Sequence, residues 1–153
     1  MVSYSVSKGG MTPLHALAMS RGDAVELAKL LIEKGADINP KWGGGGYTPL
    51  HEAVSESHLE LTKLLINNGA AINAKTESYI WRGNASPGGY TALHYSVGVW
   101  KDTRDYDSSS LREWAEQINA NTKEVAKFLI ENGAAVNAYT DWDVTPLSMT
   151  QHS

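Results

Sequence analysis

The stretch GYTPLHEAVSESHLELTKLLINNGAAINA, residues 46–74, carries the signals of two short helices joined by a turn. Thr48 is a favourable helix N-cap, and Pro49 stands at the first helical position, where its missing N–H costs no hydrogen bond. An apolar stripe at helical spacing follows, and after a polar turn a second one covers residues 59–66. Gly69 ends the second helix, because glycine tolerates the left-handed conformation found there. Two such short helices cannot bury their apolar faces alone, so we expect neighbouring copies of the unit.

Two motifs of this stretch recur along the chain in a fixed order. Thr-Pro-Leu-His at residues 48–51 has counterparts at residues 12–15, 91–94 and 145–148. Gly-Ala-x-x-Asn at residues 69–73 has counterparts at residues 35–39 and 133–137. The chain thus resembles ankyrin repeats, whose unit of roughly 33 residues carries a Thr-Pro-Leu-His signature. The resemblance implies an all-α repeat solenoid of helix-turn-helix repeats with β-hairpin fingers between them.

The resemblance also assigns structural roles to the motif residues. In the family, the imidazole hydrogen bonds the motif threonine and the nearby backbone, and the glycines end the second helices. The positions that match are Thr12, His15, Thr48, His51, Thr91, His94, Gly35, Gly69 and Gly133.

We expect a lead-in at residues 1–9 and a single repeat domain at residues 10–153. Within the domain, we place repeats at residues 10–43, 46–75 and 89–138, insertions at 75–88 and 100–120, and a partial repeat at 143–153. The partial repeat has room for one short helix, which is expected to cover Val125, Phe128 and Leu129. The four glycines at residues 43–46 are interpreted as a mobile turn, since no phosphate-binding Gly-Lys-Ser/Thr follows them.

Both insertions lengthen a connection of the basic unit. The segment from Asn73 to Thr91 spans 18 positions, against eight from Asn137 to Thr145, so this finger is expected to be longer than the others. The second insertion is expected to form a loop and then a short extra helix in SLREWAEQI, residues 110–118. Its apolar residues share one helical face, and the second helix of the repeat is expected to resume separately at residues 122–132.

Composition excludes several classes of function. The net charge of −4 argues against a nucleic-acid or anionic-membrane partner held by electrostatics. The chain has no cysteine, hence no disulfide framework, and no apolar run long enough to cross a membrane. The first residues do not resemble a signal peptide. We therefore expect a monomer in the cytoplasm or another intracellular compartment, with export to a host cell left open.

No catalytic or metal-binding constellation is evident. His15, His51 and His94 occupy the same position in three successive repeats, so they are not expected to converge on one site. No two histidines have metal-ligand spacing on one helix, and no nucleophile, kinase or dinucleotide signature occurs. We therefore predict a protein without enzymatic activity, cofactor or metal.

Aromatic residues are the most informative departure from the repeat pattern. All five tryptophans fall outside the expected helix pairs, on fingers or in the second insertion, and several tyrosines adjoin the motif threonine or histidine. Projecting Trp and Tyr side chains are frequent interface hot spots. The candidate partner-binding residues are Trp42, Tyr47, Glu52, Tyr79, Trp81, Tyr90, Tyr95, Trp100, Trp114 and Trp142.

These residues predict a non-enzymatic protein-protein interaction module that binds a partner protein through its concave groove and finger loops, as an inhibitor, adaptor or effector. Two alternatives stay open at this point. The insertions could form a pocket for a small molecule or a peptide, lined by Tyr95, Trp100 and Trp114. The chain could also be a structural fragment of a larger ankyrin protein, which bare apolar surface on the last full repeat would favour.

Overall fold

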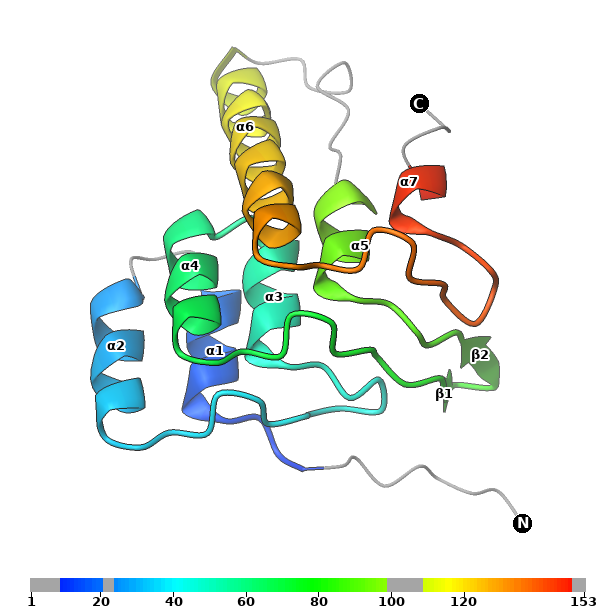
Figure 1. Cartoon of the computed structure of the whole chain (residues 1–153), viewed down its shortest axis with the longest axis horizontal. Coiled ribbons are helices and arrows are strands. Elements are labelled where there is room, and N and C mark those ends of the chain that lie inside the picture. The colour runs from blue at the N-terminus through cyan, green and yellow to red at the C-terminus, as the bar shows by residue number, and fades with distance from the viewer. Residues whose placement is uncertain (1–8, 21–23, 99–108, 150–153) are drawn as a thin grey trace.

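The computed structural model describes residues 9–20, 24–98 and 109–149. It shows paired helices stacked side by side, with loops and one small sheet projecting from one edge of the stack (Figure 1). The pairs are α1 (Pro13–Met19) with α2 (Val25–Glu33), α3 (Pro49–Ser55) with α4 (Leu59–Asn67), and α5 (Ala92–Gly98) with α6 (Ser109–Glu131). A last short helix, α7 (Pro146–Met149), follows. The predicted all-α repeat solenoid is confirmed.

The helices begin where the sequence signals placed them. Thr12 and Thr48 cap α1 and α3, and each is followed by proline at the first helical position. Gly35, Gly69 and Gly133 follow the ends of the second helices with φ near +90°, a conformation that favours glycine. First helices pack on first helices, α1 on α3 on α5 on α7, while α2, α4 and α6 form the second layer.

The core runs through the stack as one continuous cluster. Leu14, Leu50 and Leu93, one from each first helix, are almost fully buried, and so are Leu65 and Leu129 from the second helices. Because each repeat buries its apolar face on the next, stability is approximately a sum of terms between neighbours.

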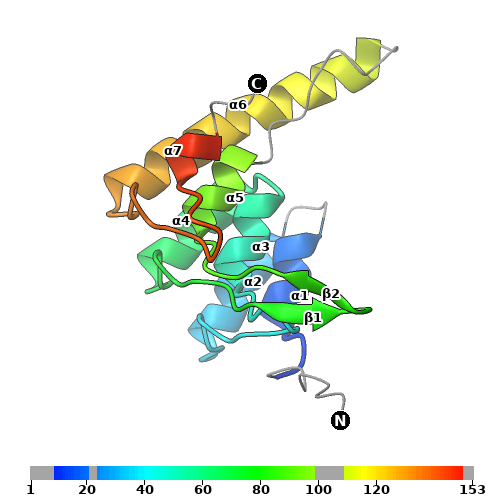
Figure 2. The ribbon, with the colours of Figure 1, turned by 90° about the vertical axis from the view of Figure 1, so that its right-hand side faces the viewer.

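Three connections between repeats form fingers, which we number in chain order. Finger 1, residues 39–47, closes through paired backbone hydrogen bonds between Trp42 and Tyr47. Finger 2, residues 73–90, is the longer one and contains an antiparallel hairpin of β1 (Tyr79–Trp81) and β2 (Asn84–Ser86). Finger 3 is residues 137–144. In Figure 2 the β1–β2 hairpin extends beyond the helices, as the first insertion predicted.

The second insertion differs from the prediction in one respect. The extra helix and the second helix of repeat three are not separate: α6 is continuous over 23 residues. The predicted helices, residues 110–118 and 122–132, are joined through residues 119–121, because a continuous helix keeps its backbone hydrogen bonds. The C-terminal half of α6 is anchored by the buried Val125 and Leu129. The N-terminal half of α6 projects beyond the stack (Figure 2).

The partial repeat also packs differently from the prediction. Helix α7 packs mainly on α5 and not mainly on α6, where Val125, Phe128 and Leu129 lie. The reason is the layering of the fold, in which a first helix stacks on the preceding first helix. The second-helix position of a fourth repeat is unfilled in the part of the chain that the structure describes.

Candidate functional site

Each motif histidine ties a finger to the first helix of its repeat. In repeat two, Nδ1 of His51 accepts a hydrogen bond from the backbone N–H of Thr48 at 3.2 Å, so the proton resides on Nε2. That Nε2 donates to the carbonyl oxygen of Ala74 in finger 2 at 3.1 Å. His15 bonds in the same way to the carbonyl of Tyr47, and His94 to that of Val144. The three imidazoles hold the fingers and do not meet in one site.

The electrostatics of these histidines agree with a structural role. Burial lowers the pKa of His51 to about 4, and burial likewise lowers the pKa of His15 and His94. A neutral imidazole suits the geometry, because protonated Nδ1 would face the N–H of the motif threonine. Across the described residues, no group of three His, Asp or Glu side chains is placed to hold a metal ion.

A row of tyrosines lies between the fingers and the first helices. We call Tyr47, Tyr95 and Tyr90 the tyrosine row. The ring centroids of Tyr47 and Tyr95 are 6.2 Å apart, and those of Tyr95 and Tyr90 are 5.8 Å apart. The imidazole of His51 packs edge-on against both Tyr47 and Tyr95. Contacts of this kind fix ring positions, so the row is arranged before any partner arrives.

Trp42 and Glu52 stand beside the tyrosine row. The indole N–H of Trp42 donates to Oε1 of Glu52 at 3.1 Å, and the Trp42 ring packs against His15. Burial raises the pKa of the Glu52 carboxyl, and the hydrogen bond from Trp42 opposes this shift. Glu52 therefore places an acidic group among half-buried aromatic rings.

The glycine run at residues 43–46 has a packing role that the sequence did not reveal. A Cβ on Gly45 would come within 2.5 Å of the Tyr47 ring, and one on Gly44 within 3.0 Å of the Tyr79 ring. Gly44 and Gly45 therefore make room for the rings of Tyr79 and Tyr47, in addition to allowing the turn. A hydrogen bond from the N–H of Glu77 to the carbonyl of Gly45 joins finger 2 to finger 1.

Fingers 2 and 3 are joined even more closely. The backbone N–H of Gly88 donates to a carboxylate oxygen of Asp141 at 2.7 Å, and the N–H of Asp141 donates to the carbonyl of Gly88 at 3.1 Å. A Cβ on Gly88 would come within 2.3 Å of the backbone nitrogen of Ser78. The fingers therefore form one connected edge along the stack, so the aromatic residues they carry have fixed relative positions.

The candidate residues do not all gather in one place. Five of them lie together: Trp42, Tyr47, Glu52, Tyr90 and Tyr95. Tyr79 adjoins this group, because its ring packs against Gly44 and its side chain hydrogen bonds to that of Tyr47. Trp142 at the tip of finger 3 is 66% exposed and has no ring partner among the described side chains.

Three further candidates have side chains beyond the described part of the structure. Trp100 lies outside the described residues. Trp81 is placed in β1 and Trp114 in α6, and the side chains of both lie outside the described ones. These three residues remain predictions.

Sequence reasoning gave no role to the asparagines of the Gly-Ala-x-x-Asn motif. The side chain of Asn39 donates to the carbonyl of Gly69 at 3.1 Å and accepts from the N–H of Ala71 at 2.8 Å. Asn73 makes the same two bonds to Gly133 and Ala135. The signal was the regular spacing of the motif, since each asparagine reaches the helix end of the next repeat.

Comparison with known families agrees with the architecture. The family model described as ankyrin repeats (3 copies) matches residues 2–76, ending where the first insertion begins. Beyond that point, the stack continues with α5, α6 and α7, and His94 makes the same histidine bonds as His15 and His51. The fold and the motif define a helical repeat protein, and the chain belongs to the ankyrin-repeat family.

Members of this family are generally protein-protein interaction modules and typically not enzymes. No curated protein matches the chain. Among the described residues, no helix combines the length and the apolar character needed to cross a membrane.

Proposed function

We propose that this protein is a non-enzymatic binding module that holds a partner protein against its concave face. The observation that carries the proposal is the tyrosine row with Trp42 and Glu52, half-buried and fixed by ring contacts and a hydrogen bond. Large rings that are already ordered lose little entropy on binding, and Trp and Tyr dominate the energetics of protein interfaces. The partner completes the burial of these rings.

The composition of the site indicates the chemistry of the partner. The Glu52 carboxyl and the tyrosine hydroxyls surround apolar ring faces, so the surface offers hydrogen-bond acceptors and flat aromatic area together. A partner segment that carries a basic side chain next to an apolar one satisfies both features, because a cation is attracted to a carboxylate and to aromatic faces alike. We propose such a segment as the element bound at the tyrosine row.

Affinity capture with a matched pair of tyrosine variants tests this proposal. Tyr90→Ala removes a ring from the tyrosine row, whereas Tyr139→Ala removes an exposed ring on finger 3 that makes no ring contact among the described residues. Proteins retained from a lysate of the cell that makes the chain are identified by mass spectrometry. We expect Tyr90→Ala to weaken binding of a retained partner by about 2 kcal/mol or more, and Tyr139→Ala to change it little.

Thermal unfolding of both variants establishes that each is folded before capture. Equal loss of the partner in the two variants would extend the binding surface from the tyrosine row to the exposed side of finger 3, and Tyr139 would no longer serve as a control. Equal retention would remove the tyrosine row from the interface and contradict the proposal.

A further inference from the structure

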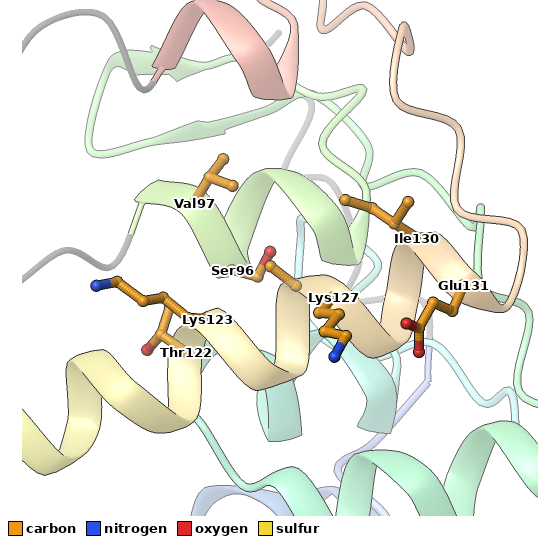
Figure 3. A pocket seen from close by; sticks show the side chains of 8 residues that line it. Ser96, Val97, Thr122, Lys123, Lys127, Ile130 and Glu131 are labelled. Carbon is orange, nitrogen blue, oxygen red and sulfur yellow. The ribbon is translucent and has the colours of Figure 1, made fainter.

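A second surface lies at the C-terminal end of the stack, away from the tyrosine row. Between α5 and α6 there is an open, mainly apolar groove of about 440 Å³. Val97 lines it from α5, and Ala126 and Ile130 line it from α6. Figure 3 shows Val97 and Ile130 coming from these two helices, with Lys123 and Lys127 along α6. We call this the end groove.

The end groove is the continuation of the interface between repeats. Thr62 of α4 corresponds to Ala126 of α6, counted back from the helix-ending glycine. Thr62 is fully buried, and the helix that carries it packs against α6. Ile66 of α4 packs against the core, whereas its counterpart Ile130 is 50% exposed. The end groove thus presents the surface that receives a second helix elsewhere in the stack.

Among the described residues, the place left open beside α6 and α7 fits one helix and not a helix pair. In a complete ankyrin repeat, a first helix would stack on α5 and a second helix on α6. Helix α7 already occupies the place on α5. A second copy of the chain stacked end to end would bring its own α1 to that place and collide with α7. The occupant is therefore a single helix.

The stack itself shows which side chains such a helix presents. Leu61 of α4 and Val125 of α6 face the preceding repeat: both are buried, while their counterpart Leu27 in α2 is 51% exposed. Leu65 and Leu129, four positions further on, are buried as well. Branched apolar residues at positions i and i+4 are thus the pattern that enters a groove of this kind.

Lys123 distinguishes the end groove from the interface that α4 makes, whereas Lys127 has a counterpart in Lys63 of α4. Position 59 in α4 is leucine, but the corresponding residue of α6 is Lys123, and Lys127 lies one turn further along the same edge. Both lysines are exposed. Glu131 also lines the groove, one turn beyond Lys127. A helix with acidic residues beside Lys123 and Lys127, and none beside Glu131, therefore complements this edge.

We propose that the end groove binds one amphipathic helix of a partner protein, with branched apolar residues at i and i+4 and an acidic flank. The helix takes the second-helix position of a fourth repeat, beside α7. This surface is separate from the tyrosine row, so the two sites can be occupied at the same time.

A peptide taken from the chain itself provides the probe. It consists of residues 57–71 with Lys63→Glu, which keeps Leu61 and Leu65 and adds an acidic flank, and it carries a fluorophore. Fluorescence polarisation with the whole chain is expected to show saturable binding. Ile130→Glu should weaken binding by on the order of tenfold or more, because a carboxylate would be buried against apolar side chains. Lys127→Glu should weaken it less, because the acidic flank of the peptide would then meet a like charge.

Matched variants at the other end of the stack serve as controls. Leu30→Glu and Lys29→Glu make the same kinds of change on exposed residues of α2 and should leave binding unchanged. A second peptide with Leu61→Asn and Leu65→Asn should not bind. Because Ile130 and Lys127 are exposed, their substitution should not unfold the chain. Circular dichroism of each variant checks that a loss of peptide binding is not a loss of folding.

Three outcomes would overturn the proposal. Absence of peptide binding would mean that the end groove is simply a solvated end of the stack. Binding that depends on Leu30 and not on Ile130 would place the site on α2. Self-association of the unliganded chain in sedimentation, abolished by Ile130→Glu, would make a second copy the occupant.

Discussion

Repeat two and repeat three share their motifs, yet the structure gives them different surroundings. Within the second layer, α4 is covered on both sides, by α2 and by α6, while α6 has a second-layer neighbour, α4, on one side only among the described residues. Ile66 of α4 is partly buried against the core, but its counterpart Ile130 of α6 is half exposed. The comparison teaches that a motif residue in a solenoid contributes through its neighbours, so identical residues in successive repeats need not have equal importance.

The largest expected difference concerns a pair of isoleucines at the same repeat position. Ile66→Ala removes packing between α4 and the core, so it should lower the free energy of unfolding by about 2 kcal/mol or more. Ile130→Ala removes a half-exposed side chain from the end groove, and the expected cost is below about 0.5 kcal/mol. Urea unfolding followed by circular dichroism measures both values.

Equal costs for the two isoleucine variants would contradict this comparison. Such a result would mean that Ile130 is buried in solution, for example by self-association. Repeating the measurement at several protein concentrations separates these cases, because association makes apparent stability depend on concentration.

Acid should affect the middle repeat before the last one. The pKa of His51 is about 4 in the folded chain, because burial disfavours the charged imidazole, and about 6.5 when the chain is unfolded. Between these values the unfolded chain binds more protons, so the stability present above about pH 6.5 is lost as pH falls towards 4. The loss is roughly 1 kcal/mol per pH unit for one histidine in this window.

A non-titrating substitution isolates this contribution. Gln at the third helical position can still bond to the N–H of the N-cap residue, so His51→Gln keeps the local cap and removes the titration. Unfolding measured near pH 7 and near pH 5 should show a smaller difference for His51→Gln than for the unmodified chain. His94→Gln, in the last repeat, should flatten the dependence less. An unchanged pH dependence in His51→Gln would show that other groups control acid sensitivity.

Recurring motifs explain why most of the fold could be predicted from the sequence. Thr48, Pro49 and Gly69 mark helix ends by local chemistry alone, and their recurrence in order identifies stacked repeats. The longer finger 2 followed from a simple excess of residues between Asn73 and Thr91. Local signals repeated at a fixed period are therefore enough to predict a solenoid.

What the sequence could not provide are the features that depend on contacts between distant segments. The continuity of α6 depends on how its C-terminal half is anchored, not on the residues between the two predicted helices. The need for glycine at Gly45 and Gly88 appears only when the Tyr47 ring and the backbone of Ser78 lie against them. The sequence also placed Trp42 and Trp142 in one class, although only Trp42 is held beside the tyrosine row.

The smallest expected effect concerns the motif asparagines. Asn73 bonds to Gly133 and Ala135 in the next repeat, so Asn73→Ala should cost about 1 to 2 kcal/mol of unfolding free energy. Asn137, at the same position of the last motif, is exposed at the end of the described stack, and Asn137→Ala should cost less than about 0.5 kcal/mol. Native-state hydrogen exchange at Ala135 adds a local readout, because its N–H donates to Asn73. Faster exchange there in Asn73→Ala alone would sharpen the contrast between covered and uncovered repeats, and equal effects of both variants would contradict it.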